Sequence, residues 1–178
     1  MPYRSSQPTA GTIQFSIADC WLGSLLIATS SAGLCAVFIG DRPESLIEAL
    51  PERFGSARVT EARTNIAEAV ERVVRCVEHP ASHFDLPLDL RGTEFQQRVW
   101  QALREIPAGT TRSYGQIAQH IDAPGSARAV ARACGANPVA VIIPCHRVIG
   151  ADGSLTGYRW GIDRKQRLLA RDGYSIPK

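Results

Sequence analysis

A cysteine, a histidine and an arginine follow one another at positions 145, 146 and 147, directly after Pro144. A cysteine thiolate is a strong nucleophile, and a neighbouring histidine or arginine would lower the pKa of the thiol. The apolar run Val141–Ile143 before them predicts a short buried strand that ends at a functional turn. Because successive side chains of an extended chain point to opposite faces, His146 reaches the Cys145 sulfur only where the backbone bends, or through a water.

An inert, buried cysteine is the competing interpretation, since free cysteine is among the most buried residue types. The chain has five cysteines, an odd number, and none of them forms a CxxC pair; they are Cys20, Cys35, Cys76, Cys134 and Cys145. This usage indicates a reducing compartment, so we expect a cytoplasmic protein without a disulfide framework. No His/Cys cluster has the spacing of metal ligands, so we expect neither a metal ion nor another cofactor.

The 178 residues are enough for one large domain or two small ones. Residues 1–11 are polar, and we expect a disordered tail there. The chain contains no apolar run of signal-peptide or membrane-spanning length. Residues 1–90 carry 7 basic and 11 acidic side chains, whereas residues 91–178 carry 13 basic and 6 acidic ones. The basic half suggests a polyanionic partner, although a solvated surface with chance asymmetry explains the same charges.

Residues 12–90 are expected to form an α/β domain. Apolar residues alternate over 12–18, and apolar runs occupy 22–29 and 34–39. The alternation is typical of a half-buried strand, and the short links between the three segments indicate hairpins. The sequence therefore predicts a three-stranded antiparallel meander.

Two helices are expected to follow the strands. Pro43 suits the first turn of one helix, and Pro51 would end or kink it. Asn65 is a good N-cap for the second, with Glu68 completing a variant of the capping box. Residues 81–92 are expected to be a linker, and we place the domain boundary near its end.

Residues 91–178 are expected to be mostly helical. Thr93 with Gln96 and Ser113 with Gln116 have the spacing of capping boxes, and each pair marks the start of a helix. Two helices that begin in this way on a basic segment are candidates for a nucleic-acid-binding unit.

Residues 113–136 have the outline of a helix-turn-helix, with the turn at 122–125. The second helix carries Arg128 and Arg132 on one face among small residues. A base-reading helix needs long polar side chains, so this smooth helix suits recognition of backbone and shape, with an arginine as a probe of the minor groove. A small-residue helix packed in a core is the alternative.

These motifs together resemble the O6-alkylguanine-DNA alkyltransferases, and most of all the C-terminal half of bacterial Ada-type adaptive-response proteins. The resemblance covers about residues 12–172. It implies an α+β fold, in which a three-stranded antiparallel, RNase H-like α/β domain precedes a mostly helical, winged-helix-like DNA-binding domain. The segments that carry it are Phe95–Gln97, Val99–Trp100, Ser113–Tyr114, Ala127–Val130, Asn137–Pro138, Pro144–Val148 and Gly157–Gly161.

The resemblance implies a DNA repair protein that acts once. Cys145 would take a methyl or small alkyl group from O6 of guanine, with O4 of thymine as a further candidate, and keep it as a thioether. His146 would take the thiol proton through a water, oriented by Asp172, and Tyr114 would stabilise the leaving guanine. Arg128 would fill the gap left by the flipped-out nucleotide.

The resemblance also implies contacts with double-stranded DNA, bound without sequence preference in the minor groove by a monomer with no membrane association. Asn137 would brace the turn between the recognition helix and the active site. The other residues expected at the substrate or the DNA are Ala127, Ala129, Arg132, Ser113, Arg147, Val148, Tyr158, Arg159 and Trp160.

Three positions depart from the commonest family pattern. Asp172 stands where glutamate is usual, and its side chain is one methylene shorter. Arg159 stands where serine is frequent, which leaves the backbone N–H to meet the substrate oxygen. Trp160 replaces a glycine of some relatives, so we expect a narrowed pocket in which benzyl-sized groups react poorly.

Two other functions compete with alkyl transfer. The first is a lesion sensor or regulator that binds DNA without chemistry; the sensors that resemble this family lack the motif cysteine, which is present here. The second is a Cys-His hydrolase, for which the sequence offers no oxyanion motif or family-specific cysteine signature.

Overall fold

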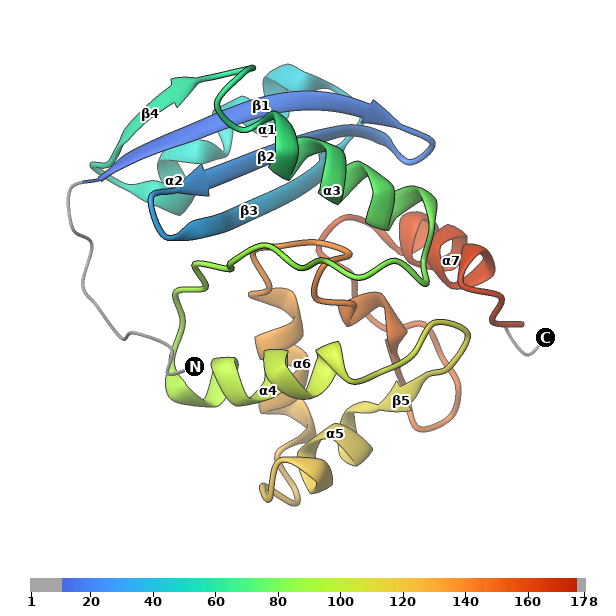
Figure 1. The fold of residues 1–178 in the computed structure, drawn as a ribbon. Helices are drawn as coiled ribbons and strands as arrows, with labels where there is room; N and C mark the ends of the chain where they lie inside the picture. The colour runs from blue at the N-terminus through green and yellow to red at the C-terminus, as the bar shows by residue number, and fades with distance from the viewer. Residues whose placement is uncertain (1–10, 176–178) are drawn as a thin grey trace. The chain divides into compact units, whose positions relative to one another are not determined.

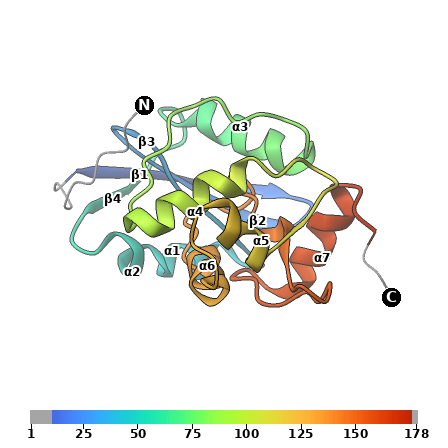
Figure 2. The same cartoon turned by 90° about the horizontal axis from the view of Figure 1, so that it is seen from below.

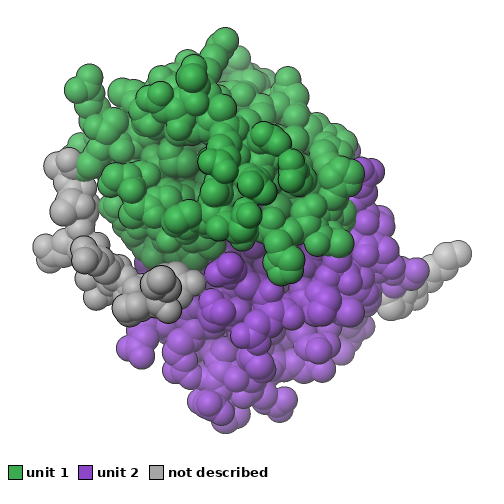
Figure 3. All heavy atoms as spheres, in the orientation of Figure 1, with its two compact units in different colours: residues 1–91 green, residues 92–178 purple. Residues whose placement is uncertain are grey.

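The computed structural model of the chain describes residues 11–175 and separates into two compact units, residues 1–91 and 92–178 (Figure 3). The tail expected over residues 1–11 lies, apart from Gly11, outside the described residues. No helix within residues 11–175 is both long and apolar enough to cross a membrane.

A four-stranded sheet is the centre of the first unit (Figure 1). Strands β1 (Thr12–Cys20), β2 (Gly23–Ser30) and β3 (Gly33–Gly40) form the antiparallel meander that the sequence predicts. A fourth strand, β4 (Arg58–Glu61), pairs in parallel with β1, so the order is β3-β2-β1-β4. The prediction of three strands was therefore wrong. Four mostly polar residues give no periodic signal, and only their pairing with β1 makes them a strand.

Helices cover both faces of this sheet, which explains why the middle of β2 is buried on every side chain from Leu25 to Ala28. Helices α1 (Pro43–Glu48) and α2 (Leu50–Phe54) lie on one face and α3 (Ala67–Glu78) on the other (Figures 1 and 2). The break between α1 and α2 comes just before Pro51, which lies in the first turn of α2.

The start of α3 differs from the prediction. Its N-cap is Ile66, no side chain caps it, and the expected box of Asn65 with Glu68 does not form. The Ala67 amide donates to the Thr64 carbonyl at 3.3 Å, so a backbone turn leads into the helix instead. Burial of Ile66 fixes this entry, because an apolar contact outweighs the gain from a polar cap on an exposed Asn65.

Three helices pack together in the second unit: α4 (Glu94–Arg104), α5 (Tyr114–His120) and α6 (Ala127–Gly135). Both predicted capping boxes are present, at Thr93 before α4 and at Ser113 before α5. The predicted helix-turn-helix therefore corresponds to α5, a tight turn and α6. The buried Trp100 indole of α4 donates to the Ala133 carbonyl of α6 at 2.9 Å and holds α6 against this layer.

The remaining elements of this unit are short. Strands β5 (Arg112–Ser113) and β6 (Val148–Ile149) pair in parallel, the 3₁₀ turn η1 (Cys145–Arg147) leads into β6, and α7 (Ile162–Arg171) follows. A wing of the usual kind is an antiparallel hairpin, and the described residues after β6 form no such hairpin. The winged-helix part of the prediction is not confirmed, whereas the mixed α+β class is.

Candidate active site

The turn before Cys145 is not the buried strand that the sequence predicts. Val141 and Ile142 form a tight turn, closed where Ala140 bridges to Ile143. The φ of Val141 is 69°, a left-handed conformation that costs a β-branched residue about 1–3 kcal/mol and is typical of functional sites. These residues are apolar because the turn is largely buried, not because they alternate in a sheet.

Cys145 opens the 3₁₀ turn η1, so the backbone bends at the cysteine as the sequence argument required. The residue is 5% exposed. The side-chain amide of the buried Asn137 donates both to the Cys145 sulfur at 3.2 Å and to the Ile143 carbonyl at 2.8 Å. The Asn137 side-chain oxygen accepts from the Val139 amide at 3.0 Å. One asparagine therefore holds the end of α6, the strained turn and the thiol in register.

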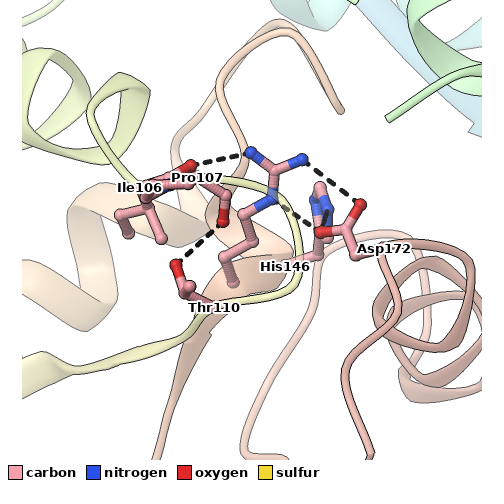
Figure 4. Close-up of polar contacts among 6 residues, drawn as sticks. Ile106, Pro107, Thr110, His146 and Asp172 are labelled. Atoms are coloured by element: carbon pink, nitrogen blue, oxygen red, sulfur yellow. Dashed lines mark hydrogen bonds and ion pairs between the residues drawn. The ribbon is translucent and has the colours of Figure 1, made fainter. Parts of the chain in front are cut away.

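His146, Asp172 and Arg147 form a buried network (Figure 4). His146 Nε2 lies 3.2 Å from Asp172 Oδ2, and the two side chains are 1% and 2% exposed. Arg147 donates from Nε to the same Oδ2 at 2.6 Å, from Nη2 to Oδ1 at 3.2 Å, and from Nη1 to the Ile106 carbonyl at 2.8 Å. Asp172, at the C-cap of α7, therefore reaches His146 directly although it is shorter than glutamate.

The network sets the protonation of its members. Burial raises the pKa of Asp172, but hydrogen bonds from His146 and Arg147 outweigh burial and leave that pKa below its usual value. Burial lowers the pKa of His146, and contact with Asp172 offsets this only in part, so the imidazole is neutral. Facing a carboxylate, Nε2 of a neutral ring carries the hydrogen. The free lone pair is then on Nδ1, which is buried and has no hydrogen-bond partner among the described residues.

Two residues expected at the DNA have other roles in the structure. Arg147 is engaged with Asp172 and the Ile106 carbonyl, and Val148 is fully buried in β6. Their expected contact with the substrate or the DNA stays a prediction. The sequence shows only that an arginine follows the histidine, and the position of Asp172 at the end of a distant helix decides where that arginine turns.

Lys165 is a site residue that sequence reasoning missed. It is 0% exposed, and its Nζ donates to the carbonyls of Val148, Thr156 and Gly157 at 2.6, 3.2 and 3.3 Å. Burial lowers the pKa of its ammonium group. Position 165 lies three and four residues before two buried leucines of α7, and that helical spacing could have placed it on the inner face.

The electrostatics at the sulfur also differ from the sequence argument. Burial raises the pKa of the Cys145 thiol, and the Asn137 hydrogen bond and the charge of Lys165 lower it only in part. The net shift is upward, so the prediction that His146 and Arg147 lower this pKa was wrong. His146 is neutral and Arg147 is paired with Asp172, which leaves Lys165 as the cation that acts on the sulfur.

A cavity of about 300 Å³ opens beside the sulfur. The Tyr114 hydroxyl donates to the Thr156 carbonyl at 2.9 Å across it, and the Tyr158 hydroxyl is buried without a hydrogen-bond partner among the described residues. The lining residues come from α5, α6, η1 and the loop before α7; they are Tyr114, Ala131, Cys134, Gly135, Cys145, Thr156, Gly157, Tyr158 and Arg159.

Trp160 does not line this cavity, contrary to the expectation that it narrows the pocket directly. The Arg159 guanidinium lies over the Trp160 ring, 5.0 Å from its centroid, and Arg159 is the residue of the pair that reaches the cavity. The contact with Arg159 is one route by which Trp160 influences the cavity.

One face of α6 is exposed beside the cavity. It carries the long side chains of Arg128 and Arg132 and the small residues Ala131 and Gly135, of which the last two also line the cavity. The flanking residues Ala127 and Ala129 are partly exposed, and Ser113 caps α5 with its side chain. A helix surface of this kind lets a large partner approach the backbone closely, and it carries two cationic groups on the same helix face.

The arrangement suits nucleophilic attack by one sulfur atom on a group that enters the cavity. It supplies a thiol, a neutral imidazole whose tautomer is fixed by a buried carboxylate, and two groups that stabilise a thiolate. Among residues 11–175, no three His, Cys, Asp or Glu side chains are grouped to hold a metal ion.

Known proteins with similar sequences and folds agree with this geometry. Residues 94–174 match the family model described as 6-O-methylguanine DNA methyltransferase, DNA binding domain. The chain is 59% identical over 165 residues to methylated-DNA–protein-cysteine methyltransferase of Mycolicibacterium paratuberculosis, and the match covers 93% of this chain and 95% of that protein. The crystal structure of Mycobacterium tuberculosis OGT in complex with DNA superposes with a TM-score of 0.75 at 41% identity, covering 90% of this chain and 92% of that one.

The bifunctional transcriptional activator/DNA repair enzyme Ada of Escherichia coli is 48% identical over 160 residues. That match covers 90% of this chain but 45% of the Ada protein. The chain thus spans about half the length of the Ada proteins that it matches.

Proposed function

Because the chain belongs to the 6-O-methylguanine DNA methyltransferase family, we propose that Cys145 accepts a methyl or small alkyl group from O6 of guanine in double-stranded DNA. The sulfur attacks the alkyl carbon, the bond from that carbon to O6 breaks, and the group remains on the protein as a thioether. A thioether does not hydrolyse, so each molecule acts once. O4-methylthymine has the same kind of alkyl–oxygen bond and is a second substrate of this proposal.

The first step is removal of the thiol proton. Burial keeps Cys145 protonated at neutral pH, so a base is needed in the site. His146 provides it at Nδ1, through a water, because Asp172 holds the hydrogen of the other ring nitrogen. The thiolate that forms is stabilised by the Asn137 amide and by the charge of Lys165.

The second step is departure of the base. A guanine that swings out of the stack enters the cavity with O6 directed at the sulfur, and its leaving oxygen or ring nitrogen develops negative charge. The Tyr114 hydroxyl, which now donates to the Thr156 carbonyl, turns to the base and donates the hydrogen bond or proton that this charge requires. The Tyr158 hydroxyl is a further donor, because it already lies buried there and no residue that the structure describes accepts its hydrogen bond.

The exposed face of α6 is the proposed DNA contact. Arg128 fills the space left by the flipped nucleotide, and Arg132 neutralises phosphate charge. The small residues between them permit close approach in the minor groove and give little sequence preference. The protein acts as a monomer in this proposal, and its free thiols are consistent with a reducing cytoplasm.

The observation that carries the proposal is a thiol held by Asn137 at the wall of a cavity that opens onto the Arg128 face of α6. The test is incubation with duplex DNA that carries one radiolabelled O6-methylguanine. We expect label on the tryptic peptide 133–147, up to one label per protein, and none with Cys145→Ser. Release of label over many turnovers indicates a hydrolase instead, and binding without transfer indicates a lesion sensor.

A further inference from the structure

The cavity contains a second thiol that the proposed reaction does not use. Cys134 lies in the last turn of α6, is 8% exposed, and lines the same cavity as Cys145. The three other cysteines belong to the first unit and none of them lines this cavity. Two thiols that line one solvent-connected cavity allow chemistry that a single thiol does not.

Asn137 connects the two cysteines. Its backbone amide donates to the Cys134 carbonyl at 3.2 Å, and its side-chain amide donates to the Cys145 sulfur at 3.2 Å. Both thiols also feel the same cation, since the charge of Lys165 lowers the pKa of each against the larger effect of burial. The charge of a Cys145 thiolate in turn raises the pKa of Cys134, which keeps the second thiol protonated while the first is ionised.

We propose that Cys134 is the resolving cysteine for Cys145, and that a peroxide converts the pair into an internal disulfide that closes the acceptor reversibly. The Cys145 thiolate attacks the peroxide O–O bond and becomes a sulfenic acid, with hydroxide as leaving group. The Cys134 sulfur then attacks the sulfenic sulfur, the S–S bond forms, and water leaves with the Cys134 proton. Overall two thiols and one peroxide give one disulfide and two waters.

The consequence follows from the chemistry of cysteine oxidation. A lone sulfenic acid proceeds to sulfinic acid, which thiols do not reduce, whereas a disulfide returns to two thiols. Because each molecule has one acceptor thiol and uses it once, irreversible oxidation of that thiol abolishes the repair capacity of the molecule. This consequence for repair rests on the proposed function, but the disulfide itself does not.

The chain offers a direct assay, because cleavage after Arg132 and Arg147 leaves both cysteines in one tryptic peptide, residues 133–147. Full-length protein is treated with hydrogen peroxide, quenched, alkylated and digested. We expect this peptide to carry no alkyl label and to be lighter than the unlabelled dithiol peptide by two hydrogens. Reduction with dithiothreitol before alkylation should restore the label on both cysteines. Methyl transfer should be lost with the peroxide dose and regained after reduction.

Cys134→Ser is the decisive variant, and Cys20→Ser is its matched control in the first unit. Each is compared with its own reduced sample, so a change in basal rate does not matter. Cys134→Ser should lose the reversible phase and accumulate sulfinic Cys145, whereas Cys20→Ser should behave as the unaltered protein does.

The proposal is overturned if the unaltered peptide keeps two free thiols or carries sulfinic Cys145 at the rate seen in Cys134→Ser. A disulfide to any other cysteine overturns it equally. If the peptide oxidises as expected but the protein never transfers a methyl group, the proposed function is refuted, whereas the proposed disulfide between Cys134 and Cys145 stands.

Discussion

Replacement of Asp172 by asparagine separates the two tasks that this carboxylate performs. Its Oδ2 faces both His146 Nε2 and Arg147 Nε, and its Oδ1 faces Arg147 Nη2. An asparagine has one acceptor oxygen, so an NH₂ group must meet one of these donors. If the oxygen stays with Arg147, the amide NH₂ faces the histidine and favours the tautomer with hydrogen on Nδ1, which cannot take the thiol proton.

The cost of this change has a structural part and a chemical part. The Asp172 and Arg147 side chains are 2% and 10% exposed, so the substitution removes the carboxylate that faces a largely buried cation. Breaking such a pair costs about 3–5 kcal/mol, which corresponds to a decrease in Tm of roughly 6–20 °C for a chain of this size. Loss of the correct tautomer lowers the transfer rate by about 10²–10⁴-fold, the usual contribution of a general base.

The assay measures the single-turnover rate of transfer from methylated duplex DNA at a temperature at which circular dichroism shows the variant folded. Asp172→Glu is the control, because it keeps the charge and supplies the glutamate that the family resemblance predicts at this position. We expect it to retain most of the rate. If the Asp172→Asn variant transfers the methyl group as fast as the unaltered protein while its Tm falls, the carboxylate only stabilises the fold, and the assignment of His146 as the general base is wrong.

Three further outcomes are expected. Lys165→Met should lower the transfer rate and also the Tm, because the thiolate loses its cation and the buried Val148 carbonyl loses a donor, at about 1–3 kcal/mol for a buried unsatisfied group; a normal rate would exclude Lys165 from the chemistry. Arg128→Ala should leave the Tm unchanged, since the side chain is exposed, and should slow transfer from duplex DNA more than from a single strand; equal slowing of both would refute the gap-filling role. The transfer rate should be nearly independent of pH between about 6.5 and 9, because neutral His146 takes the proton on demand from a thiol whose pKa lies above 9.0. Burial lowers the pKa of His146 below its usual value of 6.5, so neutral His146 stabilises the fold above pH 6.5 and this stability is lost on acidification. Both the transfer rate and the Tm should therefore fall below pH 6.5. A rate that rises in proportion to hydroxide from pH 7 to 9 would show that His146 does not act as the base.

Much of the fold was determined by local signals in the sequence. Apolar alternation in the first strand and apolar runs in the next two predicted the meander. The side chains of Thr93 and Ser113 predicted the starts of α4 and α5, because a capping box involves residues only three apart. The motif at Cys145 and the helix with Arg128 were likewise visible as contiguous runs. The structure brings Cys145, Asn137 and Tyr114 to one site, as the resemblance implied.

Only the tertiary structure decided the features that depend on residues far apart in the chain. Strand β4 exists because it pairs with β1, more than forty positions away in sequence. Arg147 turns inward because Asp172, 25 residues on, offers a buried carboxylate. Lys165, and not Arg147, is therefore the cation that acts on the Cys145 sulfur. Capping and periodicity act over a few residues and are written in the order of side chains. The partner of a charge, and hence the protonation of the site, depends on distances in space that this order does not contain.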